Sequence, residues 1–269
     1  MPTPLTLDLV AHQLARLRSQ PPLVHLLTNE VVQEISANVL LAVGAAPAMI
    51  VAEEEAAGFA AIAGAVLINV GTLHPRQLRV MHQAVAAAHA AGVPWTLDPV
   101  AAGVLAYRTE ACRELIRLQP AAIRGNASEI MALAGFGGQG RGVDSTAGSS
   151  DAVTAAEQLA RDTGAIVAVT GETDYITDGE RTLAAPWGNP LMTRVVGTGC
   201  ALSALVAAFT AGTRAGSTER LHAVAAACAV AGLAGASASA ASTGPGSFKP
   251  AFLDALYNLD PARLQDLTA

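Results

Sequence analysis

Short apolar runs alternate with longer helical patterns through the first 170 residues of the chain. The runs LVHLL, AMIVA, AVLINV, PWTLD, AAIRG and AIVAVT lie at 23–27, 48–52, 65–70, 94–98, 121–125 and 165–170. Most are apolar throughout, which is typical of strands covered on both faces. Helical patterns occur at 31–43, 53–63, 75–91, 108–118, 127–134 and 151–163. This alternation predicts a mostly parallel sheet with right-handed crossovers and helices on both faces.

Three further features extend the pattern toward the ends of the chain. An amphipathic segment at 8–19 predicts a surface helix that stops before Pro21. The segment ETDYITDGERTLAAP has two short β-like pieces around Asp178-Gly179, which predicts a hairpin and an antiparallel edge. From residue 197 onward the pattern is nearly all helical, and the Gly- and Ser-rich stretch 135–150 is expected to be a mobile loop. Because no linker or internal repeat divides the chain, residues 1–269 are predicted to form a single domain.

Composition and charge narrow the possible partners. The chain is 52% hydrophobic and 14% charged, which is ample for a packed core. The formal net charge of −6 argues against nucleic acid and anionic membranes, which both attract clustered Lys and Arg. Lys249 is the only lysine, so a Walker-type phosphate loop, which requires a lysine, is excluded.

Cysteine and histidine usage argues against zinc and against secretion. The three cysteines are widely and unequally spaced, and the six histidines show no H-x-x-x-H pattern. The N-terminus lacks the basic-then-apolar order of a signal peptide. The apolar stretch at 221–242 is rich in alanine, and its small residues favour tight burial over lipid contact. We therefore expect a cytoplasmic protein without a membrane partner.

Polar residues follow several predicted strands, at the sheet edge where α/β proteins bind ligands. Thr28 and Asn29 follow the first run, and there they either cap the next helix or meet a ligand. Asp98 ends the fourth run and either forms a turn or faces a metal ion or a reacting group. Asn126 and Glu129 have the spacing of a capping box, although Glu129 could instead serve a magnesium ion directly or through water. Arg124 could neutralise a phosphate.

The segment VVGTGCALSALVAAF, at 195–209, combines a glycine turn with the start of an apolar helix. Gly197 and Gly199 would let the backbone approach a ligand, and the amides of residues 198–201 would point out of the helix start. Such a terminus binds anions without a lysine. It is also expected to lower the pKa of the Cys200 thiol, unless Cys200 is simply a small buried hydrophobe. With the acidic residues and Arg124, this set suits phosphoryl transfer from a nucleotide with magnesium.

Collinear motifs along the chain resemble the hydroxyethylthiazole kinases, a ribokinase-like family of thiamine salvage. The motifs are TNEVVQEISANVLLAVGAAPAMIVAEEEA, LINVGTL, TLDPVAAG, AAIRGNASEIMAL, AVTGETDYITDG, VVGTGCALSALVAAF and GPGSF, and they span residues 22 to 258. The resemblance implies a three-layer α/β/α sandwich that assembles as a homotrimer with active sites near the interfaces. It also implies transfer of the ATP γ-phosphoryl group to the primary alcohol of 4-methyl-5-(2-hydroxyethyl)thiazole, with Mg²⁺ as cofactor.

The resemblance also assigns roles to individual residues. Cys200 takes the place where related small-molecule kinases carry an aspartate base and is the expected catalytic residue. The positions expected to bind the thiazole are Met49, Gly197 and Asn29. The positions expected to contact ATP are Arg124 and Thr170, and those expected near magnesium are Glu129 and Asp98.

Three alternatives remain open from the sequence. A ribokinase-like kinase could act instead on a hydroxymethylpyrimidine or a sugar. A cysteine hydrolase could use Cys200 as its nucleophile, but it would need a histidine base, and no histidine lies at an obvious strand end. A non-catalytic nucleotide-binding protein would bind ATP without forming a phosphorylated product.

Overall fold

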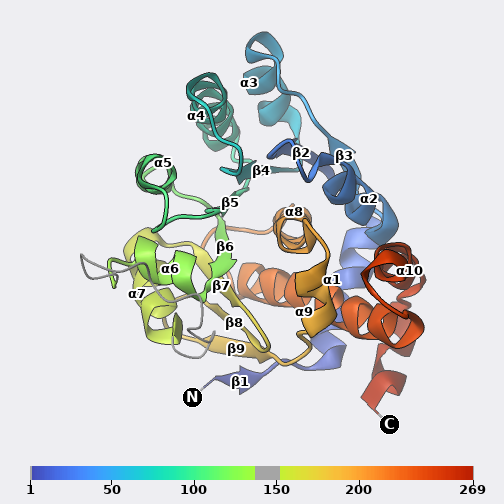
Figure 1. Cartoon of the computed structure of the whole chain (residues 1–269). Coiled ribbons are helices and arrows are strands. Elements are labelled where there is room, and N and C mark those ends of the chain that lie inside the picture. Colours follow the sequence, from blue (N-terminus) through green and yellow to red (C-terminus); the bar gives the residue numbers. More distant parts are fainter. Residues whose placement is uncertain (1, 137–151, 269) are drawn as a thin grey trace.

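The computed structural model describes residues 2–136 and 152–268, so the predicted loop at 135–150 falls almost entirely outside the described residues. Within them, nine strands form one sheet in the order β1-β9-β8-β7-β6-β5-β4-β2-β3 (Figure 1). The strands are β1 (Thr3–Pro4), β2 (Leu23–Leu27), β3 (Ala46–Ala48), β4 (Ala65–Asn69), β5 (Trp95–Asp98), β6 (Ala122–Asn126), β7 (Ile166–Thr170), β8 (Asp174–Thr177) and β9 (Thr182–Ala185).

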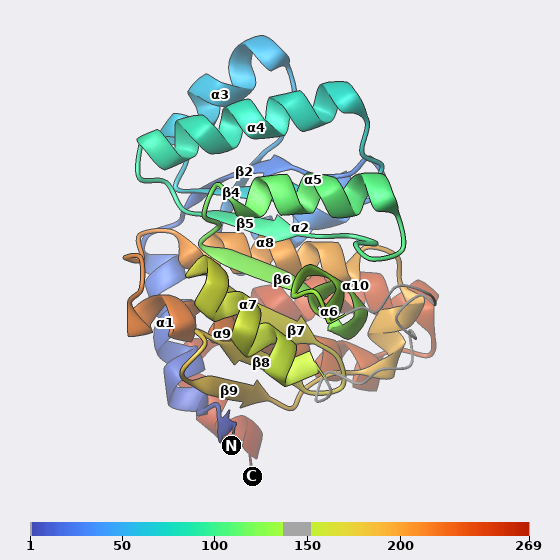
Figure 2. The same ribbon diagram turned by 90° about the vertical axis from the view of Figure 1, so that its left-hand side faces the viewer.

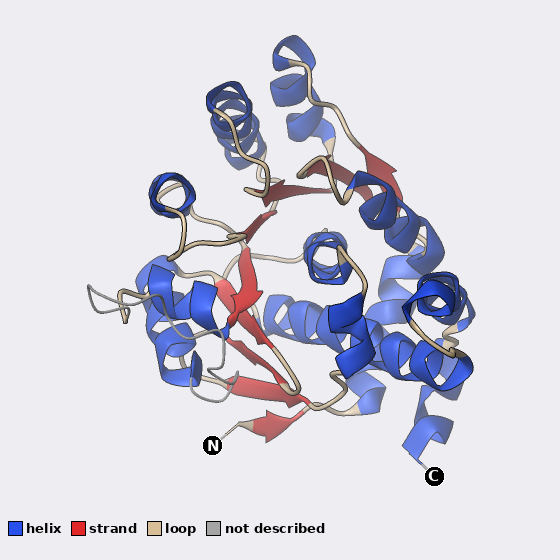
Figure 3. Ribbon diagram, viewed as in Figure 1, coloured by secondary structure: helices blue, strands red, loops and turns tan. Residues whose placement is uncertain are grey.

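Helices cover both faces of this sheet, as Figures 1 and 2 show. One layer holds α3 (Glu53–Ile62), α4 (Pro75–Ala90), α5 (Ala106–Ile116), α6 (Ala127–Leu133) and α7 (Val153–Thr163). The other holds α1 (Leu7–Ser19), α2 (Gln33–Val43), α8 (Thr198–Thr210), α9 (Thr218–Ala241) and α10 (Pro245–Asn258). Short 3₁₀ helices η2 (Pro190–Arg194) and η3 (Pro261–Thr268) complete the described elements. The predicted three-layer α/β/α sandwich is confirmed, with the sheet as its middle layer (Figure 3).

Strand directions agree with the predicted mostly parallel sheet. Only β8 runs against its neighbours β7 and β9, which confirms the predicted hairpin around Asp178-Gly179. The edge beyond β9 is closed by β1, a two-residue parallel strand that the sequence pattern does not reveal. The prediction of a strand at 48–52 is wrong in its position, because β3 ends at Ala48. As the opposite edge strand, β3 pairs only with β2, and the chain then leaves the sheet toward α3.

The two central helices are built from small residues and are buried. In α8, eleven residues are buried, and α9 packs against β7, β8 and β9. In the described part of the chain, α9 is the helix long and apolar enough to cross a membrane by length and composition, but 78% of its apolar window is buried inside the protein. The alanine-rich stretch is therefore a core helix, as its small side chains predict.

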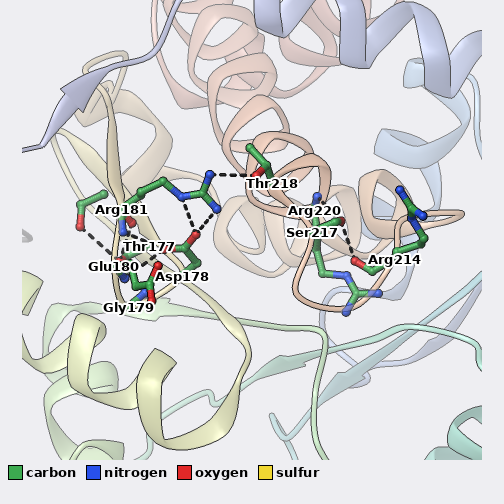
Figure 4. Close-up of polar contacts among 10 residues, drawn as sticks. Thr177, Asp178, Gly179, Glu180, Arg181, Arg214, Ser217, Thr218 and Arg220 are labelled. Atoms are coloured by element: carbon green, nitrogen blue, oxygen red, sulfur yellow. Dashed lines mark hydrogen bonds and ion pairs between the residues drawn. The ribbon is translucent and has the colours of Figure 1, made fainter.

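The β8–β9 turn is tied to the start of α9 by side-chain contacts (Figure 4). Arg181 donates to Asp178 Oδ2 through Nε at 2.9 Å and to Thr218 Oγ1 through Nη1 at 2.8 Å. Buried Arg220, in the first turn of α9, donates from Nε at 3.0 Å to Oγ1 of Thr213, which lies in the α8–α9 connection. Because Thr177 pairs with Val167 near the start of β7, this cluster lies at the sheet edge opposite to the carboxyl ends of the parallel strands.

Two arginines of α1 bind the carbonyl ends of three other helices. Arg16 donates to the last carbonyls of α8, and Arg18 donates to those of α2 and α10. The acceptors of Arg16 are Phe209 O at 2.5 Å and Ala211 O at 2.8 Å. Those of Arg18 are Val43 O at 3.2 Å, Leu259 O at 2.7 Å, Leu256 O at 3.0 Å and Tyr257 O at 3.3 Å. The cations lie at the negative ends of these helices and satisfy carbonyls that have no intrahelical donor.

We expect Arg18→Met to lower the free energy of unfolding by about 2–3 kcal/mol, since hydrogen bonds from a charged donor contribute roughly 1.5–3 kcal/mol each and methionine keeps the apolar stem. Urea unfolding followed by circular dichroism measures the change. Arg113→Met is the matched control, because Arg113 is exposed and, among the described residues, its ion pair is with Glu110 three residues earlier. A loss no larger than in this control would contradict the capping role of Arg18.

Candidate active site

Polar residues gather where the parallel strands end. Asn69 and Asp98 are the last residues of β4 and β5 and are directly paired in the sheet register. Asn126 and Thr170 are the last residues of β6 and β7 and are paired in the same way. Since all these strands run in one direction, the carboxyl edge brings together residues that lie far apart in the sequence.

A chain of hydrogen bonds links the ends of β4 and β5 to α8 through Asn29, which lies two residues after the end of β2. Asn69 donates from Nδ2 to Asp98 Oδ2 at 2.6 Å and accepts at Oδ1 from Asn29 Nδ2 at 2.9 Å. Asn29 Nδ2 also donates to Cys200 Sγ at 3.7 Å, a normal distance for a sulfur acceptor. Asn29, Asn69 and Asp98 are 4%, 0% and 1% exposed. The structure thus brings Asn29, Asp98 and Cys200 together, as expected of one site.

Asn69 is the member of this chain that the sequence analysis misses. It ends the apolar run AVLIN in the same way that Asp98 ends WTLD. A polar residue closing an otherwise apolar buried strand is therefore the signal that would have identified it.

Of the two roles considered for Asn29, helix capping is not observed. Helix α2 begins at Gln33 after Val32, and no side chain caps it. Asn29 Oδ1 instead accepts from Val31 N at 3.1 Å, two residues on, which fixes the orientation of the amide.

The Asp98 carboxyl lies inside the protein next to charged neighbours. Burial raises the pKa of Asp98 to about 6, the positive charge of Arg124 opposes this shift, and the negative charge of Glu129 adds to it. Asp98 is therefore an enclosed carboxylate that holds Asn69 and gives the carboxyl edge a negative charge.

Cys200 lies half-buried in the first turn of α8. The expectation that the helix start lowers the pKa of its thiol is wrong. Burial and the nearby charge of Asp98 raise the pKa of Cys200 to about 11, and these effects outweigh the opposing Asn29, Asn69 and Arg124. Cys200 is therefore a protonated thiol at neutral pH. Cys112 and Cys228 are buried, as their apolar surroundings in the sequence indicate.

The start of α8 forms an amide-lined turn. Gly197 is its N-cap with φ 89°, a left-handed conformation that favours glycine, and no side chain caps the helix. Ala201 N donates to Gly197 O at 2.8 Å, so the predicted set of outward amides is one too large. The amides of Thr198, Gly199 and Cys200 are those without an intrahelical acceptor.

Arg124 lies against this helix start. Its Nη1 is 3.0 Å from the point that a Cβ on Gly199 would occupy, and its Nη2 donates to Thr170 Oγ1 at 2.5 Å. Its Nε is buried and has no hydrogen-bond partner within the described residues. The guanidinium of Arg124 and the positive end of the α8 dipole lie next to each other. An anion bound between them would be attracted by both, so this place is a strong anion site.

This anion site opens into a cavity of about 700 Å³. Arg124, Thr170, Thr198 and Gly199 line one part of it, and the segment 188–193 and α9 line another. The segment can approach α9 closely because of glycine. A Cβ on Gly235 would lie 2.5 Å from Met192 Sδ. The size is in the range of small-ligand sites.

Glu129 forms the predicted capping box with Asn126. Glu129 N donates to Asn126 Oδ1 at 2.9 Å, and Asn126 N donates to Glu129 Oε2 at 2.9 Å. Ala101 N donates to Glu129 Oε1 at 2.9 Å, so both carboxylate oxygens accept backbone amides. The described residues contain no group of three or more His, Cys, Asp or Glu side chains that could hold a metal ion by themselves.

Met49 and Gly197 lie near the same edge of the molecule. Met49 directly follows β3, is half-buried and packs against the core cluster that includes α8. A Cβ on Gly197 would lie 2.8 Å from Ile35 Cγ2, so this turn packs closely on the start of α2.

Comparison with known proteins agrees with this geometry. Residues 14–262 match the model of the hydroxyethylthiazole kinase family. The chain is 59% identical to the hydroxyethylthiazole kinase of Tolumonas auensis over 269 residues, which is the full length of both proteins. The solved hydroxyethylthiazole kinase of Pyrococcus horikoshii OT3 superposes with a TM-score of 0.85 at 39% identity and covers 93% of each chain.

A more distant likeness concerns the fold alone. A ribokinase-like superfamily protein from Enterococcus faecalis V583 superposes with a TM-score of 0.69 at 13% identity, over 98% of this chain and 95% of that one. The sandwich is thus a ribokinase-like fold. The matched region includes the amide-lined turn, the anion site and the buried polar chain, and the protein therefore belongs to the hydroxyethylthiazole kinase family.

Proposed function

We propose that this protein transfers the γ-phosphoryl group of ATP to the primary alcohol of 4-methyl-5-(2-hydroxyethyl)thiazole, giving the phosphate ester and ADP in thiamine salvage. The observation that carries the proposal is the anion site formed by Arg124 and the start of α8 at the end of the cavity. This site lies directly beside Cys200, so a phosphoryl group held there is next to a side chain that can meet an alcohol.

On the nucleotide side, Arg124 and Thr170 bind phosphate oxygens of ATP. The planar guanidinium can donate two parallel hydrogen bonds, and its buried Nε has a free donor. The amides of Thr198, Gly199 and Cys200 stabilise the charge on the transferring group, because they are already oriented before the reaction begins.

On the alcohol side, Met49, Gly197 and Asn29 bind the thiazole. The flexible thioether of Met49 suits a flat sulfur heterocycle. Gly197 lets the backbone approach the hydroxyethyl group, and the fixed amide of Asn29 lies beside Cys200. These contacts place the hydroxyl oxygen in line with the phosphoryl group.

Cys200 acts on the hydroxyl mainly by position. A thiol with a pKa of about 11 is ionised in only about one molecule in 10⁴ at pH 7, so it is a weak base. Phosphoryl transfer has a loose transition state in which proton removal comes late, so orientation contributes more than basicity. As the new bond to phosphorus forms and the bond to the leaving ADP oxygen breaks, the ionised fraction of Cys200 accepts the hydroxyl proton; where the thiol is protonated, this proton passes to a phosphoryl oxygen.

Magnesium fits this site as an ion held mainly by ATP. Mg²⁺ usually keeps several waters and takes one or two carboxylates in addition to substrate phosphates. Glu129 would hold it through water, because each of its oxygens already accepts one backbone amide and retains a lone pair. The buried carboxylate of Asp98 would add negative charge that attracts the ion. When bound, the ion neutralises charge on the phosphates.

We further propose that the protein is a cytoplasmic homotrimer with active sites near the subunit interfaces. Val31 and Val196 support this assembly, because they are 65% and 72% exposed beside the turn where Gly197 packs on Val32. Large apolar side chains exposed at the rim of a site are commonly covered by another subunit.

The direct test is turnover by the purified protein with ATP and Mg²⁺ on three alcohols compared side by side. These are the thiazole alcohol, a hydroxymethylpyrimidine and a sugar such as ribose. We expect the thiazole alcohol to give the highest kcat/KM, measured by ADP release and by mass spectrometry of the ester. Preference for either other alcohol would identify a different ribokinase-like kinase. ATP binding with no phosphorylated product would contradict the proposal that the protein is an enzyme.

Cys200→Ala should reduce kcat by about 10- to 1,000-fold, roughly what loss of a weak, well-placed base allows. Cys200→Asp should retain or raise kcat, because a carboxylate is ionised at neutral pH whereas this thiol is not. Steady-state kinetics at saturating ATP measures both. A folded but inactive Cys200→Asp variant would count against the base position.

Glu129→Gln should raise the Mg²⁺ concentration needed for half-maximal rate by about 3- to 10-fold, because a neutral amide attracts a hydrated cation less strongly. The glutamine oxygen can still accept from Asn126 N in the capping box, so the helix start keeps its cap while Ala101 N loses its acceptor. The measurement is a Mg²⁺ titration of the rate at fixed ATP. Glu110→Gln is the control, since Glu110 is exposed on α5. Identical titrations for both variants would exclude Glu129 from the metal environment.

A further inference from the structure

The two asparagines of the buried polar chain have a fixed direction. An asparagine side chain can usually be placed either way round, because its oxygen and nitrogen look alike. Here the backbone decides, since Gly71 N donates to Asn69 Oδ1 at 2.9 Å and Val31 N donates to Asn29 Oδ1 at 3.1 Å. Each oxygen therefore faces a backbone donor, and each amide nitrogen must point the other way.

The orientation of each amide determines which atom donates and which accepts in the next hydrogen bond. Asn69 Nδ2 faces Asp98 Oδ2, so its oxygen remains the acceptor for Asn29. One N–H of Asn29 goes to Asn69 Oδ1, and the other goes to Cys200 Sγ. The sulfur consequently accepts a hydrogen bond from inside the protein, which leaves its own proton free to point toward the anion site.

A glycine makes room for this arrangement. A Cβ on Gly71 would lie 2.6 Å from Asn29 Nδ2 and 2.8 Å from Asn29 Cγ, distances that real side chains do not adopt. The backbone at Gly71 is not in the left-handed region, so its φ angle alone does not demand glycine. The requirement at this position is the space that the Asn29 amide occupies.

We propose that Asn69 and Gly71 are positioning residues for phosphoryl transfer, which hold the Asn29 amide so that one N–H is aimed at Cys200 Sγ. This inference rests on the proposed kinase function but concerns two residues to which that function assigns no role. Asn69 orients the amide by accepting from it, and Gly71 leaves the space in which it lies. Without them, the Asn29 amide is held by Val31 N alone and shifts, so the N–H aimed at Cys200 Sγ loses its position.

The kinetic test is a double-mutant cycle, which isolates coupling between two sites. Asn69→Ala should lower kcat about 10-fold in the native background and less than 2-fold in Cys200→Ala, with KM for ATP unchanged in both. A merely structural role would lower kcat by the same factor in both backgrounds, and this result would overturn the proposal.

Gly71→Ala provides a second variant that removes no buried polar partner. It should reproduce the pattern of Asn69→Ala, including the loss of effect in the Cys200→Ala background. Gly58→Ala is the matched control and should leave kcat unchanged, because nothing lies within 4 Å of a Cβ there. If Gly71→Ala has the same kcat as the unmodified protein, then neither the glycine nor the orientation of the Asn29 amide matters for phosphoryl transfer, and the proposal is overturned.

A readout that needs no turnover separates this inference from the kinase proposal. The chain has six asparagines, so selective ¹⁵N-asparagine labelling gives few side-chain amide signals, and Asn29→Ala assigns the relevant pair. Cys200→Ala and Asn69→Ala should each shift the Asn29 signals. Shifted signals without thiazole phosphorylation would support the hydrogen-bond chain and reject the kinase proposal. Signals unmoved by both substitutions would overturn the inference even in an active enzyme.

Discussion

The first turn of α8 is the constraint on which the site depends. This helix contacts β2, β4, β5 and β6, and its N-terminus meets their carboxyl edge with amides that have no intrahelical acceptor. Those amides need an acceptor, and the guanidinium of Arg124 adds positive charge at the same point. A phosphate supplies what both groups lack. Because α8 is almost wholly buried, this anion site is held by the core and does not depend on a flexible loop.

The rest of the fold maintains that position. Small residues in α8 and α9 allow two helices to pack closely under the sheet, and Arg16 binds the far carbonyls of α8. The helix is therefore held at both ends, by the sheet edge at its start and by α1 at its end. In the proposed reaction, backbone amides and one arginine would perform the electrostatic task that a lysine performs in a Walker loop.

A buried chain of hydrogen-bonded polar side chains supports the site from the interior of the protein. Asp98, Asn69 and Asn29 are enclosed, and each hydrogen bond that links them to one another and to Cys200 joins a donor to an acceptor. This hydrogen-bond chain meets α8 at Cys200, which is half-buried and directly follows Gly199, a residue that lines the cavity. Burial makes the thiol a poor base, so the protein gains orientation at the expense of basicity. The two properties have the same cause, the low polarity around the sulfur.

The sequence by itself determined the layers, most strands and the strand-end residues, because apolar runs with a period of two or 3.6 report local structure directly. Strand-end positions predicted Asp98 and Arg124 as site residues, and the glycine turn before an apolar helix, with the family resemblance, predicted Cys200. It did not locate β1 or the end of β3, since edge strands depend on a partner from distant sequence. It missed Asn69 and gave the wrong direction for the Cys200 pKa. Both depend on which groups surround a residue in space, and only the tertiary structure decides burial and neighbours.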